Sequence, residues 1–149
     1  MIEISKNNIT LREIEKKNIE FEGKIKTDLD FFNKIESFNN ASLLFEVIAN
    51  NKLEGYLVLE VVQAMNEFKL ARINLCINDE SIIDDVIASI TDYAVKEYFT
   101  VKIIVHLSPL NDKLINSFLN NRYIFNKSLE DKEGSLVEYK MTKPIYLGK

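Results

Sequence analysis

The spacing of hydrophobic and polar positions changes several times along the chain. Residues 9–14 alternate between apolar and polar side chains, as a half-buried strand does. Residues 28–38 have helical spacing instead, with apolar side chains at Phe31, Phe32, Ile35 and Phe38. Either Thr27 or Asp28 can cap this predicted helix. Its aromatic stripe is interpreted as part of the core.

An antiparallel meander is predicted next. Its three strands cover residues 43–49, 53–62 and 68–77. Asn50 and Asn51 form the first tight turn, and residues 63–67 form the second. Gly55 lies early in the second strand, where a glycine indicates a bulge or a close approach of two backbones.

The spacing becomes helical again after the meander. Ser81 is the predicted N-cap of this helix, with Asp84 three residues further on. Its apolar stripe contains Ile82, Ile83, Val86, Ile87, Ile90, Ala94 and Tyr98. Residues 101–107 are almost wholly apolar, which predicts a strand buried on both faces. This strand–helix–strand unit predicts a parallel pair joined by a right-handed crossover.

The last third of the chain adds one helix and two strands. The helix covers residues 112–121, the strands cover 123–127 and 136–141, and a charged turn at 130–134 joins them. The complete order is β-α-βββ-α-β-α-ββ. We therefore predict one mixed α/β domain over residues 1–149, with an antiparallel N-terminal half and a parallel pair in the middle.

Composition narrows the classes of partner. The net charge is -4 and the pI is about 5.1, which argues against nucleic acid because such partners require a basic face. No apolar run is long enough to cross a membrane. Cys76 is the only cysteine, which excludes an internal disulfide and fits a reducing cytoplasm. With a single histidine besides, the chain cannot build the usual zinc sites, so no metal is expected.

Three segments of the chain resemble a known family. Residues 9–12, Ile-Thr-Leu-Arg, are similar to its opening strand, and residues 53–57, Leu-Glu-Gly-Tyr-Leu, to its third strand. Between residues 105 and 123 the family often has an asparagine, a helix with tyrosine seven residues later, and then Gly-Phe. The counterparts here are Asn111, Phe118, Arg122 and Tyr123. In this order, the segments resemble the GNAT superfamily of N-acetyltransferases over nearly the whole chain, which implies a GNAT-like central mixed sheet.

The resemblance also implies a cofactor and a reaction. Acetyl-CoA would give its acyl group to an amine on a small molecule or peptide. A glycine-rich loop after the fourth strand would hold the pyrophosphate at a helix N-terminus, and pantetheine would lie between the splayed fourth and fifth strands. A base would deprotonate the amine, and a tyrosine would protonate the leaving thiolate. By position, the implied cofactor-binding residues are Cys76, Ile77, Asn78, Ile83, Asp84, Asp85, Val86 and Asn111.

The chain departs from the family pattern at the chemically important positions. Depending on a register of one residue, Asp84 or Asp85 falls on the first loop glycine and Val86 or Ile87 on the second. Phe118 stands at the tyrosine position and Arg122 at a glycine. Carboxylates repel a pyrophosphate, and β-branched side chains block a close backbone approach. These acids also suit the first turn of an ordinary helix, and chelation of a hard cation by Asp79, Glu80, Asp84 and Asp85 is the weaker alternative.

Three functional hypotheses remain open from the sequence. The first is an N-acetyltransferase in which His106 or Glu60 is the base. The alternative for His106 is a structural role, and the alternative for Asn111 is the N-cap of a helix. The second is a non-catalytic binding or assembly module that has lost the CoA pyrophosphate loop. The third is a peptide-binding or homodimer-forming domain that uses open strand edges.

Overall fold

The computed structural model describes residues 1–27, 31–131 and 134–148. Within these residues nine strands form one mixed sheet, with the order β1-β2-β4-β5-β6-β7-β9-β8 and with β3 paired to β6 off that path. The strands are β1 (Glu3–Lys6), β2 (Ile9–Ile14), β3 (Ile25–Lys26), β4 (Leu43–Ala49), β5 (Lys52–Met65), β6 (Phe68–Ile77), β7 (Thr100–Leu107), β8 (Ile124–Asp131) and β9 (Gly134–Thr142). The pair β6–β7 is parallel, and the other pairs of described strands are antiparallel.

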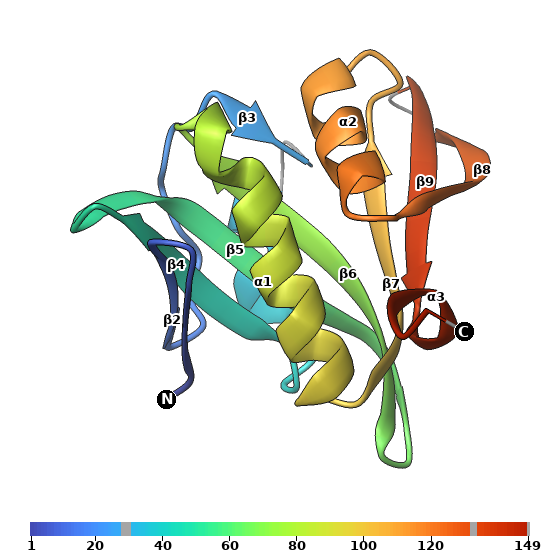
Figure 1. Ribbon diagram of the computed structural model, residues 1–149, viewed down its shortest axis with the longest axis horizontal. Coiled ribbons are helices and arrows are strands. Elements are labelled where there is room, and N and C mark those ends of the chain that lie inside the picture. Colours follow the sequence, from blue (N-terminus) through green and yellow to red (C-terminus); the bar gives the residue numbers. More distant parts are fainter. Residues whose placement is uncertain (28–30, 132–133, 149) are drawn as a thin grey trace.

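One face of the sheet carries the helices α1 (Ile83–Lys96) and α2 (Asp112–Asn120) (Figure 1). The short helix α3 (Lys143–Tyr146) follows β9. The apolar stripe of α1 packs onto alternate strand residues, and together they form the larger core cluster. The opposite face carries a smaller cluster of Ile19, Phe31, Phe32, Ile35, Leu44, Val58 and Cys76.

The strand predictions for residues 9–14, 43–49 and 68–77 match β2, β4 and β6 at both ends. Asn50 and Asn51 form the predicted tight turn, with φ of 53° and 62°. The predicted turn at 63–67 is shorter in the structure and covers residues 66–67, because β5 continues to Met65, which pairs with Phe68. The charged turn at 130–134 is also shorter, since β8 reaches Asp131 and β9 starts at Gly134.

The predicted helix over residues 28–38 is also wrong. The described part forms two short 3-10 turns, Phe31–Asn33 and Ile35–Ser37; Asp28, the alternative cap, lies outside the described residues. Phenylalanine, asparagine and serine are only moderate helix formers, so packing of the aromatic rings on the sheet determines the backbone. Thr27 does not cap a helix, because it pairs with Leu75 of β6 instead.

No helix among the described residues is both long and apolar enough to span a bilayer.

Candidate functional site

The strands β6 and β7 pair over only part of their length. Residues Lys69–Arg72 pair with partners between Thr100 and Ile104, and no pairing follows beyond that point. The C-terminal halves of the two strands diverge below the start of α1 and α2 (Figure 1). Diverging parallel strands leave two edges with unpaired N–H and C=O groups, and in a buried place these groups need other partners.

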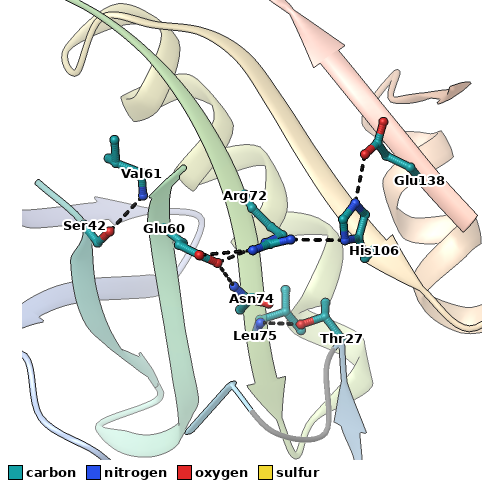
Figure 2. Close-up of polar contacts among 9 residues, drawn as sticks. All are labelled: Thr27, Ser42, Glu60, Val61, Arg72, Asn74, Leu75, His106 and Glu138. Carbon is teal, nitrogen blue, oxygen red and sulfur yellow. Dashed lines mark hydrogen bonds and ion pairs between the residues drawn. The ribbon is translucent and has the colours of Figure 1, made fainter. Parts of the chain in front are cut away.

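Another segment of the same chain pairs with the edge of β6 that β7 leaves free. In β3, Ile25 is opposite Ile77 and Lys26 is opposite Cys76. The Thr27 amide donates to the Leu75 carbonyl (3.1 Å), and the Leu75 amide donates to Thr27 Oγ1 (3.0 Å; Figure 2). Because β5 pairs with the other edge of β6 as far as Ile77, this is the edge that faces β7. We call residues 23–27 the strap.

A cavity of about 660 Å³ lies beside the strap, where β6 and β7 end. Its charged lining consists of Lys24, Lys26, Lys113, Asp79 and Glu80. Two residues predicted to bind the cofactor, Asn78 and Asn111, also line it. We call this space the α1–α2 cavity, because its walls include the segments that lead into both helices.

The other predicted cofactor residues do not reach this cavity. Four of them are in the core and at most 1% exposed, namely Cys76, Ile77, Ile83 and Val86. The two acids of the first α1 turn point to different neighbours. Asp84 accepts from Asn120 Nδ2 (3.2 Å), whereas Asp85 accepts from Asn7 Nδ2 in the β1–β2 turn (3.4 Å). Helical periodicity thus separates residues that the sequence places side by side.

Just before α1, an aspartate side chain accepts a hydrogen bond from a backbone amide of the same segment. Asp79 Oδ1 accepts from the Ser81 amide (2.9 Å) and from the Ser81 hydroxyl (2.7 Å). Asp79 therefore caps the 3-10 turn Glu80–Ile82 that leads into α1. The N-cap of α1 itself is Ile82, without a side-chain hydrogen bond, so the prediction for Ser81 is wrong. The hydrogen bonds from Ser81 hold the pKa of Asp79 below its ordinary value. Glu80 forms an ion pair with Lys113 of α2. Within the described residues, no three acidic, histidine or cysteine side chains converge as a metal site.

The opposite face of the sheet carries a continuous row of polar side chains (Figure 2). Glu60 accepts from Arg72 Nε (3.0 Å), Arg72 Nη2 (3.1 Å) and Asn74 Nδ2 (3.0 Å). Arg72 Nη1 lies 3.3 Å from His106 Nδ1, and His106 Nε2 lies 2.9 Å from Glu138 Oε1. We call these five residues the polar row. It brings together both predicted bases, Glu60 and His106.

The hydrogen bonds of the polar row define the tautomer of His106. A guanidinium only donates, so His106 Nδ1 accepts from Arg72 and the ring proton is on Nε2, which donates to Glu138. Both ring nitrogens of His106 are thus engaged, and the lone pair on Nδ1 is already used. Glu60 accepts three hydrogen bonds. Neither predicted base has a free position facing the α1–α2 cavity.

Glu138, like Arg72 and Asn74, is a member of the polar row that the sequence did not single out. Its side chain is 7% exposed and also accepts from Asn126. Burial by itself raises the pKa of Glu138, but the hydrogen bonds from His106 and Asn126 together lower it below its ordinary value. The signal that could have identified Glu138 is its register opposite His106, and that register depends on the pairing of β7 with β9.

We expect Glu138→Gln to reduce the pH dependence of stability in acid. A carboxyl whose folded pKa is depressed stabilises the protein above its unfolded pKa, and this contribution disappears as the pH falls through the folded value. At pH 7 the variant should lose about 1–2 kcal/mol of unfolding free energy, as expected for hydrogen bonds to a charged group. As the pH falls below the depressed folded pKa of Glu138, the two proteins should converge. Urea denaturation across this range measures both, with the exposed Glu20→Gln as control. Parallel pH curves would contradict the assignment.

Two family positions, Asn111 and Phe118, lie at the start and near the end of α2. Asn111 is its N-cap, because Asn111 Oδ1 accepts from the Leu114 amide (3.4 Å). Phe118 is fully buried, with its ring edge-on to Tyr123 at 4.9 Å between centroids. Arg122 has a φ of 68°, which explains why glycine suits this position. The Arg122 guanidinium donates to the carbonyls of Ile145 and Tyr146 and so holds α3.

No protein-family model and no curated protein matches this sequence. Solved structures of acetyltransferases do match in three dimensions. Spermidine N-acetyltransferase from Vibrio cholerae, in complex with CoA and spermine, has a TM-score of 0.70 at 16% identity, over 94% of this chain and 98% of that chain. RimL, a ribosomal-protein N-acetyltransferase in complex with coenzyme A, has a TM-score of 0.73 at 9% identity, over 95% and 98%. The chain has the GNAT fold. This agrees with the fold that the sequence resemblance implied.

The GNAT fold makes it necessary to ask whether CoA fits this chain. The resemblance implies pantetheine between the strands that are β6 and β7 here, and pyrophosphate at the start of α1. The strap pairs with that edge of β6, and the Asp79 carboxylate accepts from the Ser81 amide in the 3-10 turn just before α1. In place of the expected tyrosine, Phe118 is buried and carries no hydroxyl. These residues do not fit CoA in the way that the resemblance implies.

Proposed function

We propose that this chain is a ligand-binding protein with the GNAT fold that does not transfer acetyl groups. One observation carries the proposal: the strap forms backbone hydrogen bonds with β6 where an acyl-CoA would have to lie. The α1–α2 cavity remains beside the strap, and its volume of about 660 Å³ suits a small molecule. Its charged lining is mixed, with three lysines and two carboxylates, and one of the lysines is paired with Glu80.

The electrostatics at the start of α1 support the same conclusion. A pyrophosphate would meet Asp79 and Glu80, which line the cavity. Like charges repel at short range, and water screens this repulsion only in part. Asp79 has a lowered pKa and therefore stays ionised at neutral pH. Lys113 offsets only part of this charge, because it is paired with Glu80.

The proposal predicts that acetyl-CoA does not stabilise the wild-type protein. A ligand present at about 100 times its Kd stabilises a protein by about 2.7 kcal/mol, which corresponds to roughly 5–11 °C in Tm for a domain of this size. Thermal unfolding with and without millimolar acetyl-CoA should instead give the same Tm, and a calorimetric titration should show no binding heat. A saturable rise in Tm would contradict the proposal. ADP, which lacks the pantetheine arm, is the control ligand.

An active N-acetyltransferase that acts on an amine is the second candidate, and the polar row favours it. A second cavity, of about 360 Å³, opens on that face and is lined by Glu60, Arg72 and Asn74. A carboxylate in such a cavity suits a cationic amine. In this case the reaction would require Arg72 to release Glu60 or His106. Amine-dependent release of CoA thiol, measured with spermine and with a peptide that has a free N-terminus, would establish this candidate and exclude the first.

A further inference from the structure

The strap is attached to β6 by contacts from its backbone and from its side chains. Ile25 is 8% exposed and belongs to the larger core cluster. Thr27 exchanges two hydrogen bonds with Leu75, one through its amide and one through its hydroxyl. On the outer side, the Asn111 side-chain amide lies 3.4 Å from the Lys26 carbonyl. The strap is thus held between β6 and the loop that leads into α2.

The strap also passes directly over the single cysteine. A Cβ atom added to Gly23 would lie only 2.3 Å from Cys76 Sγ and 3.2 Å from the Ile77 amide nitrogen. Cys76 is fully buried. Burial raises the pKa of this thiol, although a contact with Gly23 and the nearby Lys26 act in the opposite direction. The thiol is therefore unreactive while the strap is in place, because the thiolate is the reactive form.

We propose that the strap is an internal ligand of the β6 edge, and that it is what keeps this groove closed to an extended ligand with amide groups. Beyond Arg72 the β6 edge is not paired with β7, and the strap supplies donors and acceptors to the edge as an added strand would. A pantetheine arm or a peptide offers the same amide groups in an extended chain. Such a ligand and the strap therefore exclude each other.

The inference deepens the proposed function and rests on it, because it names the element that keeps acyl-CoA out. The carboxylates before α1 are the competing explanation, and they are unchanged when the strap is loosened. A variant with a loosened strap therefore distinguishes two reasons why acyl-CoA would not bind: a closed groove, or repulsion of its phosphates. Cys76 reports on the strap itself, without any requirement for activity.

The test uses the variant Ile25→Ala/Thr27→Val, which removes a core anchor and the hydroxyl that accepts from Leu75. We expect Cys76 to react with a thiol reagent at least about tenfold faster than in the wild type, because the open state is more populated. Acetyl-CoA should also bind at least about tenfold more tightly, whereas ADP should not. Ile9→Ala is the matched control, since Ile9 is an equally apolar residue of the same core cluster but lies in β2.

If the double variant fails to fold, Thr27→Val alone removes one hydrogen bond at nearly constant volume and should raise thiol reactivity by roughly threefold or more. A thiol that stays as protected as in the wild type would overturn the inference. So would a reactive thiol without tighter acetyl-CoA binding, and that result would leave the proposed function standing. Acetyl transfer to an amine by the loosened variant would support the strap and contradict the non-catalytic proposal.

Discussion

Replacing Gly55 with alanine is expected to lower the unfolding free energy by about 3 kcal/mol or more. A Cβ atom at this position would lie 2.0 Å from the Cys76 carbonyl oxygen and 2.9 Å from the Ile77 Cα atom. Both are backbone atoms of the paired strand, so no side-chain rotation relieves the clash. Strands β5 and β6 would have to separate where the strap is attached. The predicted close approach at Gly55 is thereby confirmed.

Thermal and urea unfolding of Gly55→Ala measure this effect, which corresponds to a fall in Tm of roughly 6–12 °C. The control is Leu53→Ala, because Leu53 is in the same strand but is 39% exposed; it should change the stability by less than about 1 kcal/mol. The Cys76 thiol should also react faster in Gly55→Ala, since the strap binds to the displaced part of β6. A variant as stable as the wild type would contradict the close contact of β5 and β6.

Phe118→Ala is expected to lower the unfolding free energy by about 3–5 kcal/mol, since the ring is fully buried and leaves a cavity. The informative companion is Phe118→Tyr, which restores the residue that the family pattern has there. Its hydroxyl would enter the core beside Tyr123, and a buried hydroxyl without a partner costs about 1–3 kcal/mol. We therefore expect Phe118→Tyr to be less stable than the wild type and to remain inactive with acetyl-CoA and amines.

Urea denaturation measures the unfolding free energy of each variant at position 118. Leu119→Ala is the control, because Leu119 is the next residue of α2 but is 46% exposed. Acetyl transfer by a stable Phe118→Tyr protein would show that the tyrosine position faces a working site, contrary to the burial of this ring.

The sheet could largely be predicted because most of its strands bury at least one face. In residues 9–14, 43–49 and 68–77, alternation or dense apolar residues mark both the strand and its ends. The strap could not be predicted in this way. It consists of two paired residues and Thr27 in a polar segment, and its pairing with β6 is a contact between residues about fifty positions apart. No local period contains that information.

The candidate site shows a similar division. The helical spacing of Ile83 and Val86 already places them in the core, so their cofactor role depended on the resemblance and not on the helix pattern. The polar row, by contrast, needs the order of β5, β6, β7 and β9 in the sheet. Only that order brings Glu138 opposite His106 and Arg72 beside Glu60.

The most direct test of the account is the exchange rate of the Thr27 amide hydrogen, measured by NMR with and without acetyl-CoA. This amide donates to the Leu75 carbonyl when the strap closes the groove. We expect a protected Thr27 amide whose exchange rate and chemical shift stay the same when acetyl-CoA is added. An amide that exchanges freely, or that loses its protection as acetyl-CoA is added, would show that the groove is open to the cofactor and would contradict the account.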